Sequence, residues 1–78
     1  MSMIIGELIK NDARVNASKR FLQNMDSESF IHVLVEICCE LGVEIPIWTM
    51  NEERILEKKK EVVVDIGEEE KLRISVAE

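Results

Sequence analysis

The sequence is poor in the residue types that build active sites and stacking surfaces. Its 78 residues include one histidine, one tryptophan, two phenylalanines and no tyrosine. So few aromatic residues exclude the stacking platform on which proteins that bind single-stranded nucleic acid depend. No catalytic signature, phosphate-binding loop or clear metal-ligand spacing is present. We therefore expect a non-enzymatic protein with no cofactor and no small-molecule ligand.

Cysteine and long apolar runs are also scarce, and both absences bear on where the protein works. The only cysteines, Cys38 and Cys39, are adjacent in a predicted helix, where successive side chains diverge by about 100°. They do not bridge each other, so no disulfide framework is expected. No apolar run is long enough to span a bilayer, and residues 1–10 lack the basic and apolar segments of a secretion signal. We expect a cytoplasmic protein without membrane contact.

Apolar and charged residues are what the sequence has in quantity, at 46% and 33% of the chain. This composition and length predict one small globular domain over residues 1–78. The net charge of −6 is unevenly spread: residues 1–25 carry four basic and two acidic groups, and residues 26–50 carry five acidic groups and no Lys or Arg. An acidic chain argues against nucleic acid as a partner. The basic first third beside an acidic middle predicts ion pairs within the fold or between subunits.

Residues 26–42 hold the strongest periodic pattern in the chain. Asp26 or Ser27 suits an N-cap and Gly42 suits a helix end, which predicts the main helix over about residues 27–41. The apolar arc of this helix is wider than one neighbouring helix would cover, so the pattern favours packing against a sheet face. That arc consists of Phe30, Ile31, Leu34, Ile37, Cys38 and Leu41, with Val33 and Val35 at its margins.

The first third predicts two strands. Residues 3–10 are rich in apolar and β-branched residues, and Asn11 and Asp12 then signal a turn. Residues 13–22 alternate loosely, and a second strand completing a hairpin is our preferred prediction. A short helix over residues 17–24 is the alternative.

The segment after Gly42 predicts an extended stretch and then a short helix. Pro46 keeps the stretch extended, and the apolar residues of one alternating phase, Val43, Ile45 and Ile47, are expected to cover the core. Thr49 and Glu52 have the spacing of a capping box, and acidic residues lead while lysines follow. These signals predict a second helix over about residues 50–60.

The last third predicts an antiparallel hairpin of residues 61–66 and 71–77, with Gly67 and three glutamates in its loop. Together the elements predict an α+β fold, in which an antiparallel sheet of three to four strands carries the helix of residues 27–41 on one face. The other face, with Val63 and one side of residues 3–10, is then a candidate contact surface.

Several short segments carry a family resemblance. They are residues 5–11 (IGELIKN), Phe30 with Leu34, residues 36–38 and 40–41, residues 46–48 (PIW) and residues 71–74 (KLRI). Through them the chain resembles a family of small uncharacterised bacterial proteins of the Gram-positive, anaerobe-rich kind. Members more often approach the last strand through a segment of the kind DFDRL, from which residues 67–71 depart. The resemblance implies a cytoplasmic α+β domain and carries over no functional residue.

His32, Glu36 and Cys39 are the candidate metal ligands, because their spacing aligns them along the polar side of the main helix. One helix rarely supplies a full tetrahedral set, and no fourth ligand is indicated. A solvated His–Glu pair beside a thiol is the preferred interpretation, and a metal-binding protein is the minor alternative.

The adjacent thiols of Cys38 and Cys39 are also candidates for redox or nucleophilic chemistry. Reactive thiols usually lie at helix N-termini or beside cations, whereas these lie near the C-terminal end among glutamates. We interpret Cys38 as a small core residue.

Two basic segments, Lys19-Arg20 and Lys58-Lys59-Lys60, suggest an alternative function as a nucleic-acid-associated regulator. Lysines at the end of a helix more often complement its dipole, and neighbouring glutamates cancel much of their field. Nucleic acid therefore stays the less favoured partner.

The leading hypothesis is a non-enzymatic protein-interaction or structural domain that self-associates as a homodimer or binds another protein. Its contact surface is expected at the acidic helix face or an exposed strand edge. Trp48 is either an interface anchor or a seal at the edge of the core, and the core is preferred. The residues proposed for contact are Trp48, Val63, Lys58, Lys59 and Lys60.

Overall fold

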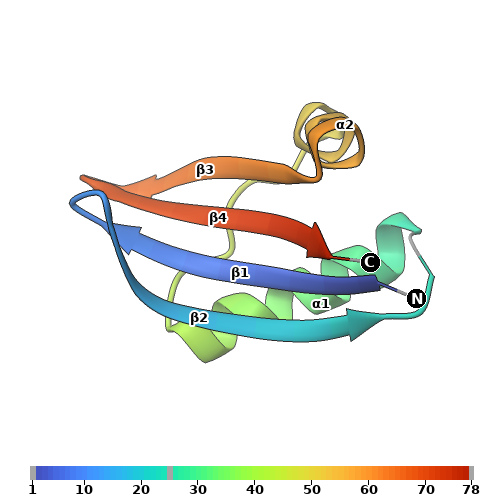
Figure 1. The fold of residues 1–78 in the computed structure, drawn as a ribbon, viewed down its shortest axis with the longest axis horizontal. Helices are drawn as coiled ribbons and strands as arrows, with labels where there is room; N and C mark the ends of the chain where they lie inside the picture. The colour runs from blue at the N-terminus through green and yellow to red at the C-terminus, as the bar shows by residue number, and fades with distance from the viewer. Residues whose placement is uncertain (1, 25, 78) are drawn as a thin grey trace.

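The computed structural model describes residues 2–24 and 26–77 and has an α+β fold (Figure 1). Its elements are β1 (Ser2–Lys10), β2 (Ala13–Leu22), α1 (Ser27–Leu41), α2 (Met50–Lys59), β3 (Glu61–Gly67) and β4 (Glu70–Ala77). The predicted fold class is confirmed, and the sheet has four strands.

The strands form one antiparallel sheet in the order β2-β1-β4-β3. Each hairpin pairs its own two strands, and β1 pairs with β4, so the first and last strands of the chain lie at the centre of the sheet. β2 and β3 are therefore the two edge strands. At one end of the sheet the two hairpin loops meet, where the Asn11 amide donates a hydrogen bond to the Glu69 carbonyl at 3.0 Å.

α1 begins and ends at the predicted caps. The Asp26 carboxylate accepts hydrogen bonds from the amide and the hydroxyl of Ser29, at 2.9 and 3.1 Å. These bonds, the amide bond most, lower the pKa of Asp26 below its ordinary value. Gly42 takes a left-handed backbone with φ 72°, and its amide donates to carbonyls of the last helical turn.

α1 covers one face of the sheet and lies mainly against β1 and β2 (Figure 1). The approach is closest at Gly6, where an added Cβ would overlap the side chain of Ile37. The predicted apolar arc faces the sheet, although Ile31 at its rim is 39% exposed. The buried core consists of Ile4, Leu8, Leu22, Phe30, Val33, Leu34, Ile37, Cys38, Leu41, Leu56, Val62, Leu72 and Ile74.

Residues 13–22 form a strand, as preferred, and the alternative helix over residues 17–24 is wrong. The reason lies in the turn before them, where Asn11 and Asp12 both have positive φ, 50° and 64°. Two positive φ values are typical of the type I′ turn, whose twist returns the chain directly into a hairpin. β2 then pairs with β1 along its whole length.

The prediction that Val43, Ile45 and Ile47 cover the core is right only for Val43, which packs against it. Ile45 is 53% exposed and Ile47 is 85% exposed. The segment is extended but pairs with no strand of the described chain, so no ladder holds its alternate side chains toward the core.

α2 has the predicted capping box: the Thr49 side chain accepts from the Asn51 amide at 3.2 Å, and Glu52 reaches back to the Thr49 amide at 3.0 Å. The following hairpin loop is shorter than predicted, because Gly67 and Glu70 pair within the sheet. Only residues 68 and 69 remain in the turn, and Glu69 adopts φ 57° to close it.

Candidate interaction surface

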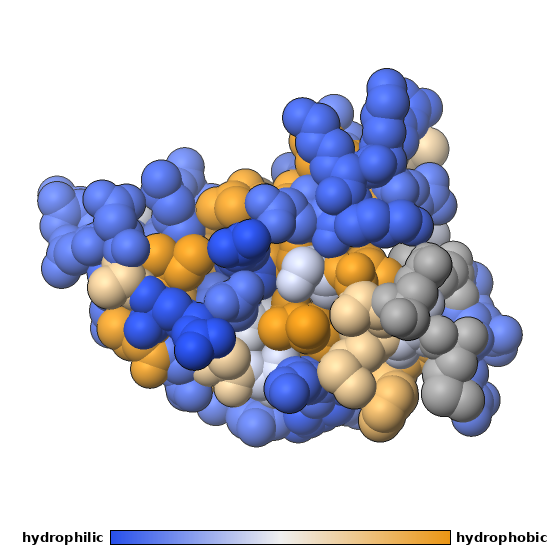
Figure 2. Space-filling model, viewed as in Figure 1, coloured by the Kyte–Doolittle hydropathy of each residue, from blue (hydrophilic) through white to orange (hydrophobic). Residues whose placement is uncertain are grey.

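The sheet face opposite α1, here called the open face, is covered by neither helix of the described chain (Figures 1 and 2). Strand alternation and register assign its side chains. Phe21 is 67% exposed and Val63 is 48% exposed. The large apolar residues on this face are Met3, Ile5, Ile9, Phe21 and Val63.

Charged side chains hold one another in place at the centre of the open face. Glu7 of β1 lies 3.5 Å from Arg14 Nη1 of β2 and 3.9 Å from Arg73 Nε of β4. Arg73 Nη2 also donates to Glu61 Oε2 of β3 at 2.7 Å. This last bond is the main reason that the pKa of Arg73 is raised above its ordinary value. One network thus connects all four strands across the apolar residues.

The register orders these charges by sign across the sheet. One row runs Lys19, Ile5, Ser75, Glu61, and another runs Arg14, Ile9, Lys71, Asp65. In both rows the edge strand β2 carries a base and the edge strand β3 carries an acid. The open face is therefore basic at one edge and acidic at the other.

The other face of β2 makes the ion pairs expected between the basic first third and the acidic middle. Arg20 Nε lies 3.3 Å from Glu36 Oε2, and its Nη2 donates to Glu40 Oε2. Ser18 Oγ donates to the same Glu40 oxygen at 3.0 Å. The hydrogen bond from Arg20 lowers the pKa of Glu40 and raises that of Arg20. These contacts tie α1 to the edge strand, so the predicted pairing occurs within the fold.

The candidate ligands His32, Glu36 and Cys39 all lie on the exposed side of α1. Glu36 is engaged by Arg20. Nowhere in residues 2–24 and 26–77 do three or more His, Cys, Asp or Glu side chains gather as a metal site would require.

The two thiols lie in different surroundings. Cys38 is fully buried, and this burial, with a smaller effect from Cys39, raises the pKa of its thiol. A buried thiol with a raised pKa is a poor nucleophile. Cys38 is thus the core residue that the sequence indicates, and Cys39 is an exposed free thiol.

Trp48 lies at the edge of the core, in agreement with the preferred interpretation. Its ring centroid lies 5.0 Å from that of Phe30, at an interplanar angle of 37°. It packs against the core from the extended segment before α2. Its indole Nε1 is buried and has no hydrogen-bond acceptor among the described residues.

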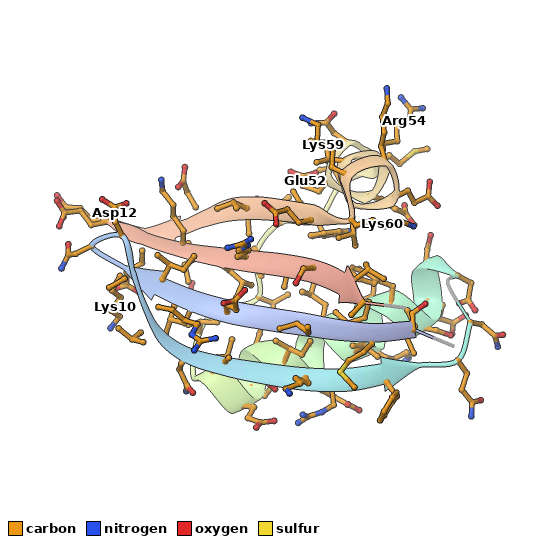
Figure 3. The ribbon with its side chains drawn as sticks, in the orientation of Figure 1. Lys10, Asp12, Glu52, Arg54, Lys59 and Lys60 are labelled. Atoms are coloured by element: carbon orange, nitrogen blue, oxygen red, sulfur yellow. The ribbon has the colours of Figure 1, made fainter. Side chains whose placement is uncertain are left out.

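The two basic segments do not form one patch. Lys58, Lys59 and Lys60 are exposed at the end of α2, beside β3, whereas Lys19-Arg20 lies on β2 at the opposite edge of the sheet (Figure 3). Arg20 is also engaged by two glutamates of α1.

A shallow groove of about 460 Å³ runs beside β3, between this edge strand and α2. It is lined by Ile47 and Ile55 together with side chains of β3 that include Val63. Val63 therefore belongs to the rim of this groove as well as to the open face. Sequence reasoning missed Ile47 because alternation assigned it to the core.

Comparison with family models, curated proteins and solved structures gave no match to this chain. In the described part of the chain, no helix combines the length and the apolar character needed to cross a membrane. The geometry of the chain itself must therefore carry the functional argument.

Proposed function

We propose that the protein is a non-enzymatic protein-interaction domain whose contact surface is the open face. The single observation that carries this proposal is the exposure of Phe21 and Val63 on a sheet face that no helix covers. Exposed aromatic and aliphatic side chains grouped on one face are typical of protein contact sites.

The composition of the open face supports the same function. Apolar side chains alternate with ion-paired charges that are already fixed, such as Glu7 with Arg14 and Arg73. Fixed side chains lose little conformational freedom on binding, which favours association. The groove beside β3 is smaller in apolar extent and continuous with this face at Val63.

Sedimentation across a concentration series, together with capture of proteins from a cell extract, tests the proposal. Wild-type protein is expected to self-associate or to retain a specific protein. Phe21→Glu places a charge in the contact surface and should abolish that association. Ile47→Glu is the matched control, because Ile47 is more exposed than Phe21 but lies off the open face.

A strictly monomeric wild-type protein that retains no protein would contradict the proposal. So would association that survives Phe21→Glu but is lost with Ile47→Glu, because the contact surface would then lie at the segment before α2. The unfolding midpoint of each variant shows whether the fold is intact.

A further inference from the structure

We infer that the open face binds a second copy of this chain, across a two-fold axis that runs parallel to the strands between β1 and β4. This inference rests on the proposed function and names its partner. The ordering of charge across the sheet and the charge balance of the face carry it.

Of the whole surface, the open face is the part on which two acidic chains repel each other least. Its basic side chains are Arg14, Lys19, Lys71 and Arg73, and its acidic side chains are Glu7, Glu61 and Asp65. Four bases against three acids give a charge of +1. Because the chain carries −6 in total, the remaining surface carries −7. Contact through the open face therefore keeps the acidic surfaces of two copies apart.

The proposed axis pairs opposite charges in every charged row. Rotation about it lays β2 of one copy over β3 of the other, at the same level along the strands. Lys19 then faces Glu61 of the second copy, and Arg14 faces Asp65 of the second copy, by the register of the rows. Each pair occurs twice, as a two-fold interface requires.

The centre of the same arrangement is complementary too. Glu7 faces Arg73 of the second copy, and Ile5 faces Ser75 of the second copy. Small and apolar residues meet in the row between, where Ala17 faces Val63 of the second copy. Packed sheets usually cross at about 30°, which long Lys and Arg side chains accommodate.

A two-fold axis perpendicular to the strands in the plane of contact gives the opposite result. It lays β2 over β2 and β3 over β3, which brings Lys19 and Arg14 of one copy against the same bases of the other. The acidic Glu61 and Asp65 meet in the same way. Like charges in opposition disfavour this arrangement.

The contact area suits a weak but specific dimer. Four strands of about eight residues cover roughly 26 Å by 19 Å, so two copies bury on the order of 1,000 Å². This is the lower limit for specific interfaces, and we expect a dimer that dissociates on dilution.

Complementary charge reversal tests the arrangement. Lys19→Glu and Glu61→Lys, each alone, place like charges opposite each other twice and should weaken self-association by about tenfold or more. Mixing the two variants should restore association, because each copy then presents the charge that the other lacks. Lys58→Glu, on α2, is the control and should leave association unchanged. Sedimentation velocity of each variant and of the mixture supplies the readout.

The outcomes separate this inference from the proposed function. Restored association in the mixture supports the two-fold arrangement, and misfolded single variants cannot produce it. A wild-type dimer whose charge-reversed variants do not associate on mixing overturns the arrangement. A monomeric wild type that retains another protein through Phe21 overturns this inference alone, whereas a monomer that retains none overturns both.

Discussion

Gly6 of β1 lies directly against Ile37 of α1, whose side chain fills the space that a Cβ at residue 6 would need. This contact sets how closely the helix approaches the sheet. Because the same strand presents Ile5 and Glu7 to the other side, the contact also fixes the backbone beneath the open face.

Gly6→Ala should lower the free energy of unfolding by about 1–3 kcal/mol, because the methyl group overpacks the helix–sheet contact. Denaturant unfolding of the full chain measures the change. Gly67→Ala is the matched control, since a Cβ there meets its nearest neighbour at 3.7 Å, an ordinary contact. Equal stability of the Gly6 variant and wild type would contradict the close approach.

Leu34→Ala should destabilise the protein by about 2–5 kcal/mol, because Leu34 is completely buried and its loss leaves a cavity between α1 and the sheet. The same substitution at the exposed Ile47 should change stability by less than about 0.5 kcal/mol. Thermal or denaturant unfolding compares the two. Similar losses at both sites would mean that the extended segment after α1 is packed rather than exposed.

Trp48→Phe should keep stability within about 1 kcal/mol of wild type, because it retains the ring contact with Phe30 and removes a buried indole N–H that lacks an acceptor. Trp48→Ala, which removes the ring, should lose about 3 kcal/mol. Unfolding followed by circular dichroism measures both variants. A Trp48→Phe variant as unstable as Trp48→Ala would show that the indole nitrogen has a partner.

Stability should fall as the solution is acidified below the ordinary carboxyl pKa. The pKa values of Asp26, Glu40 and Glu52 are all lowered in the folded chain by hydrogen bonds. A lowered folded pKa means that the unfolded chain binds more protons, so this stability is present above the ordinary values of 3.8 for Asp and 4.5 for Glu. It is lost as pH falls through the folded values.

Denaturant midpoints across a pH series test this dependence, and Glu40→Gln identifies one contributor. The variant should be less stable than wild type at neutral pH, with a smaller further loss in acid, because the carboxylate that Arg20 stabilises is gone. An unchanged acid slope would mean that the Arg20–Glu40 bond does not persist in solution.

Local signals explain how much of the fold the sequence predicts. The bounds of α1 follow from Asp26 and Gly42, and the start of α2 follows from Thr49 and Glu52, because caps act over a few residues. The pairing of β1 with β4 has no such local signal, since it joins the two ends of the chain. The strand order therefore could not be predicted.

The contact surface was predicted only in part for the same reason. Alternation placed Val63 on the face away from the core, and the charge blocks predicted pairing that Arg20 and Glu36 make. The ordering of Lys19 and Glu61 at opposite edges depends on register across four strands, which no single segment encodes. Such an arrangement appears only once the strands are assembled.

A dilution series followed by methyl NMR of the wild-type chain tests the central claim most directly. The account predicts concentration-dependent shifts of Ile5 and Val63 methyl groups on the open face, while Ile31 on α1 and Ile47 before α2 stay unchanged. Shifts confined to Ile31 or Ile47, or no shift at any concentration, would contradict the assignment of the open face as the surface that binds a second copy.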